Sequence, residues 1–354
     1  MRFEHETLAQ RVCFVPGEAR ATVRAEVERL GGSRVMVIAS AHEAELAKTV
    51  TSDVPVVVHH DEVVMHVPVA SAERARAAAT AHDVDLVISV GGGSTTGLAK
   101  AVALTTGVPI VAVPTTYAGS EATSVWGLTE GARKTTGVDA RVLPRTIVYD
   151  AELTLSLPVA MSVASGLNAL AHCVDSMWAP RTDPVDQALA GEGIRALDAG
   201  LPAVVADPSG REGREQMLYG AYLSAVAFSS AGSGLHHKIC HVLGGRYALP
   251  HAETHAVVLP YVLAFNAPAA PSAERRIAEA FGTASALEGL GRLRSAVDAP
   301  TALRDHGLAE SGIDDAVPAI LDAAPPSNPR AVTADGVRRL LRAAWEGTGP
   351  ADAS

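Results

Sequence analysis

The spacing of the apolar residues changes once along this chain, near residue 152, and that change limits the folds it can adopt. Before it, short apolar runs such as residues 34–40 (RVMVIAS) and 85–91 (DLVISVG) alternate with amphipathic stretches of helical period. Buried strands separated by helices are typical of a parallel sheet covered on both faces. After it, the long apolar stretches fit helical spacing, for example residues 157–178 and 213–232. We therefore predict an α/β domain over residues 1–152 and an all-helical domain over residues 153–354.

Composition excludes several classes of protein. With 48% hydrophobic residues and a mean hydropathy of +0.18, the chain can fill two buried cores. A net charge of −10 without a basic stripe argues against a nucleic-acid partner. No apolar run reaches the roughly 20 residues that span a membrane, and the N-terminal MRFEHETLAQ lacks the apolar core of a signal peptide. Three widely spaced cysteines suit a reducing compartment, so we expect a cytoplasmic protein.

A glycine-rich turn follows one of the buried strands. Gly91–Ser94 (GGGS) comes after a strand and opens a helix, where unhindered backbone N–H groups bind phosphate. Because the GxGxxG fingerprint is absent, a tight turn without a ligand is the alternative interpretation. Residues 114–123 (PTTYAGSEAT) place hydroxyls after the next strand, within a segment (117–142) that we expect to be a hairpin or loop. Together the loops predict a Rossmann-like site for a phosphate-bearing cofactor, with the candidate residues Gly92, Gly93, Ser94, Thr115, Thr116, Thr123 and Lys134.

Position 40 bears on which nicotinamide cofactor such a site would accept. A carboxylate after the second strand would repel the 2′-phosphate of NADPH. Here that strand ends at Ser40, followed by Ala41 and His42. We therefore predict that Ser40 contacts the cofactor and that both NADH and NADPH are tolerated.

The stretch from Gly234 to Pro260 contains five histidines, at positions 236, 237, 241, 251 and 255. In a helix His237 and His241 share a face, and Gly244–Gly245 would end that helix. Pro250 sets the chain direction just before His251, and a sixth histidine, His172, lies in another helical segment. Satisfied core histidines and a solvated helix face are the alternative interpretation. We favour a site, because several imidazoles among apolar residues can point at one place.

These motifs resemble those of the iron-containing alcohol dehydrogenase superfamily, which shares its architecture with dehydroquinate synthase. The resemblance rests on GGGSTTGLAK (91–100), VPTTYAGSEAT (113–123) and the histidine stretch, and it covers nearly the whole chain. Within the superfamily, YAGSEATSVWGLTEGARKTTG, SGLNALAHCVDS and LPHAETHAVVLP are similar to the maleylacetate reductases. The resemblance implies a Rossmann-like nucleotide domain, an all-helical catalytic domain and a homodimer.

Two departures from the metal-dependent members bear on the chemistry. Their glycine motif reads GGGSxxDxAK, and the aspartate position is Gly97 here. Their metal is held by one aspartate and three histidines, and these positions fall on Asn168, His172, His237 and His251. Because the only anionic ligand has become an amide, we expect no metal, although three imidazoles alone could still hold a divalent ion.

The resemblance further implies reduction of a carbon–carbon double bond conjugated to a ketone in a dicarboxylate substrate. Hydrogen-bond donors or an imidazolium can stabilise the resulting enolate without a metal. His241 is the first candidate for the proton donor, with His172, His237, His251 and Tyr117 as others, and Asn168, Lys238 and Arg246 are candidates for substrate binding. The alternatives are a metal-dependent alcohol dehydrogenase, a zinc-dependent cyclase like dehydroquinate synthase, and a non-catalytic cofactor-binding protein.

Overall fold

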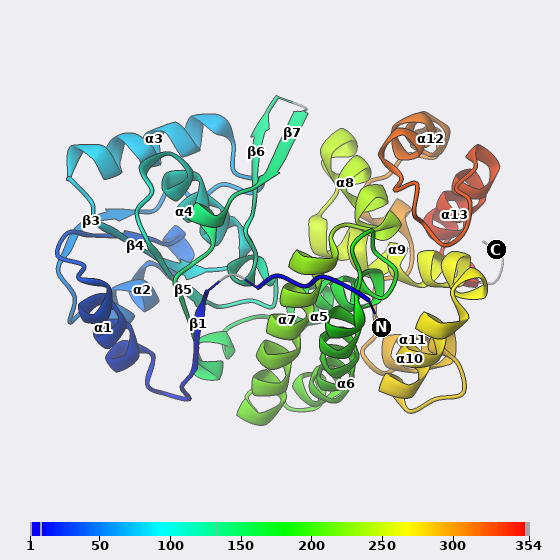
Figure 1. Cartoon of the computed structure of the whole chain (residues 1–354), viewed down its shortest axis with the longest axis horizontal. Coiled ribbons are helices and arrows are strands. Elements are labelled where there is room, and N and C mark those ends of the chain that lie inside the picture. The colour runs from blue at the N-terminus through cyan, green and yellow to red at the C-terminus, as the bar shows by residue number, and fades with distance from the viewer. Residues whose placement is uncertain (1, 8, 132, 351–354) are drawn as a thin grey trace. The chain divides into compact units, whose positions relative to one another are not determined.

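The computed structural model describes residues 2–7, 9–131 and 133–350, with the backbone alone for Arg133 and Lys134 (Figure 1). It divides into two compact units, one spanning Thr7–Leu157 and the other Pro158–Ser354 together with Met1–Glu6. The division falls five residues after the predicted boundary, because Asp150 caps the short 3-10 turn Ala151–Thr154 and Leu153 packs on the core of the sheet. Among the described helices, none has the length and hydropathy needed to cross a bilayer.

The first unit is built on a six-stranded parallel sheet, as predicted. Its strands are β1 (Arg11–Phe14), β2 (Val35–Ile38), β3 (Val56–His60), β4 (Leu86–Gly91), β5 (Ile110–Pro114) and β8 (Thr146–Tyr149). They pair in the order β1-β8-β5-β4-β2-β3, and every pairing is parallel. The order changes direction between β2 and β4, because the chain continues from β2 to β3 toward one edge and from β4 to β5 toward the other. Ligands of open α/β sheets bind where the order reverses, at the carboxyl edge.

Alternate residues of each strand serve opposite layers of helices. Val35 and Val37 of β2 pack with α1 (Ala19–Leu30) and α2 (Ala44–Val50). Met36 and Ile38 pack with α3 (Val69–Ala81) and α4 (Gly93–Thr106). The period of two along a strand thus explains why these runs are apolar on both faces.

Residues 117–142, for which we predicted a hairpin or a loop, contain a hairpin after β5. It consists of β6 (Val125–Glu130) and β7 (Arg133–Val138), which pair antiparallel. Thr129 anchors it to the loop before α3, with its N–H 3.1 Å from the carbonyl of Val67 and its hydroxyl 2.8 Å from that of His66.

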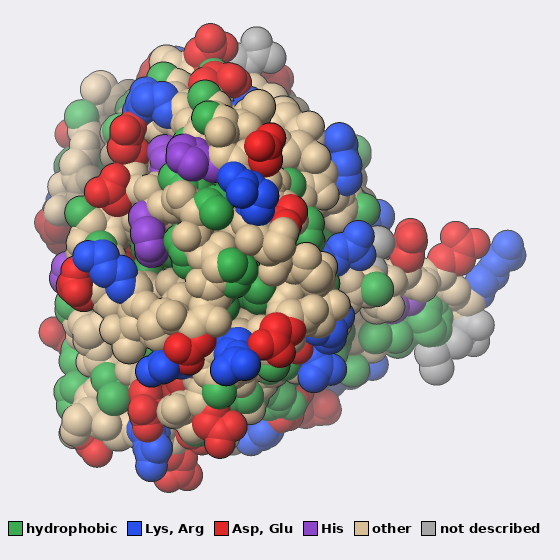
Figure 2. Space-filling model, turned by 90° about the vertical axis from the view of Figure 1, so that its left-hand side faces the viewer, with side chains coloured by type: hydrophobic (Ala, Val, Ile, Leu, Met, Phe, Trp, Pro, Cys, Tyr) green, Lys and Arg blue, Asp and Glu red, His purple; other side chains and the backbone are tan. Residues whose placement is uncertain are grey.

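On the face drawn in Figure 2, basic and acidic side chains are interspersed and do not gather into a basic stripe.

The second unit is helical in its described part. Its long helices are α5 (Val159–Ser176), α6 (Pro184–Ala206), α7 (Arg211–Ala231), α8 (Leu235–Tyr247), α9 (His251–Asn266), α10 (Pro271–Phe281), α11 (Ala286–Ala296), α12 (Ser311–Ala323) and α13 (Ala334–Glu346). α8 and α9 share one apolar core with α12 and α13. Pro250 precedes the first residue of α9, as predicted, so His251 and His255 lie one turn apart on the same helix.

The predicted end of α8 at Gly244–Gly245 is wrong. The helix continues to Tyr247, and the left-handed residue that ends it is Ala248, with φ of 53°. Tyr247 holds the last turn, since its ring packs on the core, its hydroxyl donates to Asp315 Oδ2 at 2.7 Å, and the same oxygen lies 3.0 Å from Gly312 O. Tertiary anchoring by one aromatic residue therefore outweighs the helix-breaking tendency of two glycines.

Candidate active site

The glycine turn between β4 and α4 has no room for side chains. A Cβ on Gly91, whose φ is +151°, would lie 2.4 Å from Thr95 Oγ1 and 2.6 Å from Glu43 Oε2. A Cβ on Gly92 would meet the methyl of Thr116 at 3.0 Å. Gly92 caps the helix that begins at Gly93, and both remain partly exposed, as does Ser94. The first backbone N–H groups of α4 are thus open at the carboxyl edge of the sheet, where an anion binds well.

The neighbouring threonines join this edge. Thr115 follows β5, its N–H bonds to Gly91 O at 3.2 Å, and its hydroxyl donates to Glu43 Oε1 at 2.5 Å. Thr123 accepts from the buried ammonium of Lys100 at 3.0 Å. The structure therefore gathers the predicted glycines with Thr115 and Thr116 around one turn, and it joins Thr123 to α4 through Lys100. Tyr117, a candidate proton donor, is fully buried in this unit.

Glu43 is a carboxylate at this edge that our sequence analysis missed. It ends the 3-10 turn Ala41–Glu43 after β2, and Ser40 Oγ donates to its Oε2 at 2.9 Å. The prediction concerned the position directly after the strand, whereas one turn brings residue 43 back to the strand end. The spacing S-x-x-E, from Ser40 to Glu43, is a helix-start pattern that could have revealed it.

Lys100 is a second missed residue, and it ties α4 to the loop after β5. Its side chain is fully buried, and its ammonium donates to Thr123 O at 2.8 Å and to Val125 O at 2.7 Å. Burial lowers the pKa of Lys100 to about 7. These bonds hold the threonine loop against α4, the helix that begins at the glycine turn.

Gly97, where the superfamily motif has aspartate, faces Val67. A Cβ there would lie 2.9 Å from Val67 Cγ2. Val67 has φ of 49°, an unusual value for a β-branched residue. The space of the absent carboxylate is thus taken by an apolar side chain from the loop before α3.

The helical unit brings all six predicted histidines together. His172 comes from α5, while α8 and α9 supply the other five, at positions 236, 237, 241, 251 and 255. The ring of His172 stacks on that of His237, with centroids 4.9 Å apart, and the rings of His251 and His255 lie 4.4 Å apart. His241 stands with its ring edge toward His237, at 6.0 Å. Phe228, which the sequence did not single out, packs on His172 and His237 at 4.8 and 4.3 Å.

Asp175 orients His237, and it too was missed. Its Oδ2 lies 2.8 Å from His237 Nδ1 and 2.9 Å from the N–H of Gly234. Burial raises the pKa of Asp175 to about 6, so at pH 7 it is mainly an acceptor and His237 Nδ1 carries the proton. Burial and the neighbouring imidazoles lower the pKa of His237 well below its usual value, so Nε2 presents a lone pair.

Several buried polar atoms of the described residues make no hydrogen bond, and three of them lie at the superfamily metal positions. These three are Asn168 Oδ1, His172 Nδ1 and His237 Nε2. Asn168 and His172 lie one turn apart on α5, as predicted. Buried polar atoms are ordinarily paired, so orphans of this kind indicate where a polar ligand binds.

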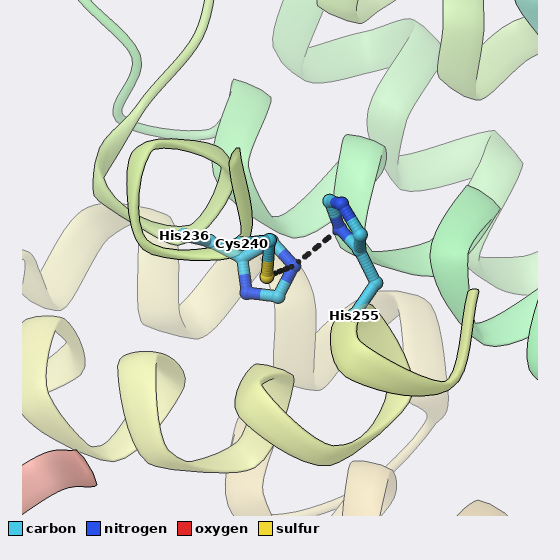
Figure 3. A group of neighbouring side chains, drawn as sticks. All are labelled: His236, Cys240 and His255. Atoms are coloured by element: carbon cyan, nitrogen blue, oxygen red, sulfur yellow. Dashed lines mark hydrogen bonds between the residues drawn. The ribbon is translucent and has the colours of Figure 1, made fainter. Parts of the chain in front are cut away.

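His236, Cys240 and His255 form a second layer of the cluster (Figure 3). His236 Nε2 is 2.9 Å from His255 Nδ1, and the Cys240 sulfur is 3.7 Å from His236 Nε2. Burial raises the pKa of the Cys240 thiol well above its usual value and lowers the pKa of His236 to about 3. These side chains are therefore neutral and pack as a polar wall beside His237.

The superfamily metal positions do not fit a metal well in this chain. Asn168 supplies a neutral amide where a carboxylate is needed, and Asp175 is engaged with His237 Nδ1. Among the described residues, two groups of three side chains bring ligand-type atoms within 4.8 Å of one another, and neither contains His172, His237 or His251. A dication would therefore have imidazoles and an amide alone, a weaker donor set than three imidazoles with a carboxylate.

The remaining substrate candidates differ in their surroundings. Lys238 is partly exposed on α8, next to His237. Arg246 is exposed, and its guanidinium already forms a two-bond ion pair with Asp315, at 2.7 and 2.8 Å. The structure thus gives Arg246 a different partner from the one we predicted. The side chain of Lys134 lies outside the described residues.

Two family models together match most of this chain. Residues 9–151 match the family described as iron-containing alcohol dehydrogenase, and residues 162–345 match the C-terminal part of the Fe-containing alcohol dehydrogenase family. The maleylacetate reductase of Pseudomonas sp. (strain P51) is 43% identical over 352 residues, which cover 99% of both chains. The solved maleylacetate reductase of Agrobacterium tumefaciens is 39% identical with a TM-score of 0.93, over 98% of this chain and 99% of that one. An iron-containing alcohol dehydrogenase from Corynebacterium glutamicum is 62% identical with a TM-score of 0.98, over 100% and 99% of the two chains.

Proposed function

Since this chain belongs to the iron-containing alcohol dehydrogenase family, in its maleylacetate reductase branch, it is an oxidoreductase, and we propose that it reduces maleylacetate to 3-oxoadipate. Membership implies a nicotinamide cofactor, which we take to be NADH or NADPH. The observation that carries the proposal is Asn168, an amide where metal-dependent members have their carboxylate ligand. Reduction of a conjugated alkene needs no metal, whereas polarising an isolated carbonyl is helped by one.

The proposed reaction adds a hydride and a proton across the carbon–carbon double bond. The nicotinamide, when bound, supplies hydride to the carbon beta to the ketone, and the alkene electrons move onto the ketone oxygen as an enolate. Free His237 is neutral with a lone pair on Nε2, so it binds that oxygen only after taking up a proton from solvent when the anionic substrate binds. The negative charge of Asp175 on the other nitrogen stabilises this imidazolium form, which donates from Nε2. A dianionic substrate favours the same imidazolium. Protonation of the carbon alpha to the ketone, which we assign to His241, completes the product.

The substrate carboxylates require positive or amide donors. We assign Lys238 to them, because it is partly exposed beside His237. Asn168 would contribute through the N–H groups of its amide, since a carboxylate only accepts. We further expect a cytoplasmic homodimer that serves the degradation of resorcinol, hydroxyquinol or chlorinated aromatic compounds.

A second candidate is a metal-dependent alcohol dehydrogenase. The observation in its favour is the name carried by the 62% identical protein from Corynebacterium glutamicum. The two functions separate by substrate and by metal requirement.

One assay tests the proposal. Oxidation of NADH is followed with maleylacetate and then with simple aldehydes, each with and without EDTA. We expect turnover on the order of 10 s⁻¹ with maleylacetate alone, unchanged by the chelator, because the site lacks the anionic ligand of a metal centre. Metal analysis of the same preparation is the control. One metal per chain at the superfamily positions together with loss of activity in EDTA, or oxidation of ordinary alcohols instead, would contradict the proposal.

Cofactor preference gives a second prediction. Glu43 lies at the carboxyl edge, where its charge disfavours the 2′-phosphate of NADPH, yet the residue directly after the strand is uncharged. We expect NADH to be preferred by less than about 10³-fold in kcat/KM (roughly 4 kcal/mol). Glu43→Gln keeps one oxygen that can accept from Ser40 or Thr115. Because it removes the negative charge, it should lower the ratio of kcat/KM for NADH to that for NADPH. A larger preference, or an unchanged ratio in the variant, would show that other residues set cofactor choice.

A further inference from the structure

Two carboxylates and an imidazole meet at the N-terminal end of α6, outside the histidine cluster. His5 Nδ1 lies 2.7 Å from Asp183 Oδ2 and 3.9 Å from Asp186 Oδ1. One ligand-type atom from each of the three residues lies within 4.8 Å of the others. All three belong to the helical unit, although His5 and Asp183 are 178 positions apart in the chain.

Asp186 is the unusual member. It is fully buried, and neither carboxylate oxygen makes a hydrogen bond of normal geometry. The neighbouring hydroxyl of Ser230, 3.4 Å from His5 Nδ1, partly opposes the rise in the pKa of Asp186 that burial and Asp183 cause. Asp183 uses Oδ1 to cap α6, accepting from the N–H groups of Val185 and Asp186, and so leaves Oδ2 facing His5. Ligand-type oxygens from both carboxylates are thus left without a capping role.

With both carboxylates ionised, the charges at this place balance only with a cation, the other neutral state being a protonated Asp186 beside an imidazolium. Two carboxylates with a neutral imidazole carry −2, and protonation of His5 leaves −1 next to a buried carboxylate. Buried charge without a counter-ion is strongly unfavourable. A divalent ion with a neutral imidazole brings the sum to zero. One nitrogen and two carboxylate oxygens form a donor set that suits zinc, manganese or cobalt.

We propose that His5, Asp183 and Asp186 bind one divalent transition-metal ion, of the class of Zn²⁺ or Mn²⁺, which fastens the N-terminal segment to the start of α6. The site shares no residue with the superfamily metal positions, and no step of the reaction depends on it. Because unfolded chain lacks the arrangement, the ion stabilises the folded state in proportion to its occupancy.

The test uses Mn²⁺ as the probe on full-length protein freed of metal with EDTA. Free Mn²⁺ is counted by electron paramagnetic resonance during titration of the wild type and of Asp186→Asn, which keeps the side-chain shape and removes a buried charge. We expect one ion per chain in the wild type and affinity at least about tenfold weaker in the variant. Hydrogen exchange over residues 2–6 should slow with Mn²⁺ in the wild type alone.

A matched control lies on the same helix. Asp198→Asn removes a carboxylate of α6 that pairs with Arg292, so it should leave Mn²⁺ binding unchanged. Equal binding by Asp186→Asn and the wild type would place the ion elsewhere, for example among the histidines, and overturn the proposal. No binding at millimolar Mn²⁺ would overturn it too, as would N-terminal protection that follows pH and not metal, because protonated His5 would then be the counter-ion.

Discussion

Replacing Asp175 with asparagine is expected to lower kcat about 100-fold, or roughly 2.7 kcal/mol of transition-state stabilisation. Asn Oδ1 can still accept from the N–H of Gly234 and from His237 Nδ1, so the local fold is preserved. The negative charge is lost, and with it the stabilisation of an imidazolium at His237 when the enolate forms. KM for NADH should change by less than about threefold, since the glycine turn and its threonines belong to the other unit.

Three measurements separate this role from a structural one. Steady-state kinetics give kcat and KM, ¹⁵N spectra of labelled histidine report the tautomer of His237, and urea unfolding reports stability. Asp198→Asn is the control for loss of a carboxylate in the same unit. If Asp175→Asn has the kcat of the wild type and only a lower free energy of unfolding, then Asp175 is a packing residue and His237 lacks its proposed partner.

The architecture was predictable because it depends on local periodicity. Val35 and Val37 alternate with Met36 and Ile38, so a strand covered on both faces is visible within seven letters. The histidine cluster was predictable for a similar reason, since five of its six members lie within one stretch of 27 residues between Gly234 and Pro260. Only His172 required the resemblance to the superfamily to connect it with the others.

What could not be predicted depends on partners far away in the chain. The end of α8 is decided by Tyr247 reaching Gly312 and Asp315, and no property of Gly244 or Gly245 reveals that. Asp175 looks like an ordinary polar residue near the end of a helix until Gly234 and His237 meet it 59 and 62 positions later.

Surface charge and buried charge also look alike in a sequence. Arg246 adjoins the histidine helix and was a reasonable substrate ligand, yet it is exposed and paired with Asp315. Lys100 was passed over, although it is fully buried and holds the threonine loop. Lys100 supports the site and Arg246 does not because only Lys100 is buried, and burial depends on how the elements pack.

His241→Ala is expected to reduce turnover by at least about 100-fold while cofactor binding persists. His241 is the least buried imidazole of the three on α8, and its ring stands 6.0 Å from that of His237, so it can exchange protons with solvent while remaining next to the proposed enolate. Removing it leaves the enolate without its proton source. In stopped-flow experiments the rate of hydride transfer should then fall less than steady-state turnover does. The Kd for NADH, measured by fluorescence titration, should be unchanged. His59→Ala, which removes an exposed imidazole of β3, should behave as the wild type. Wild-type turnover in His241→Ala would instead transfer the proton-donor role to His172, His237 or His251.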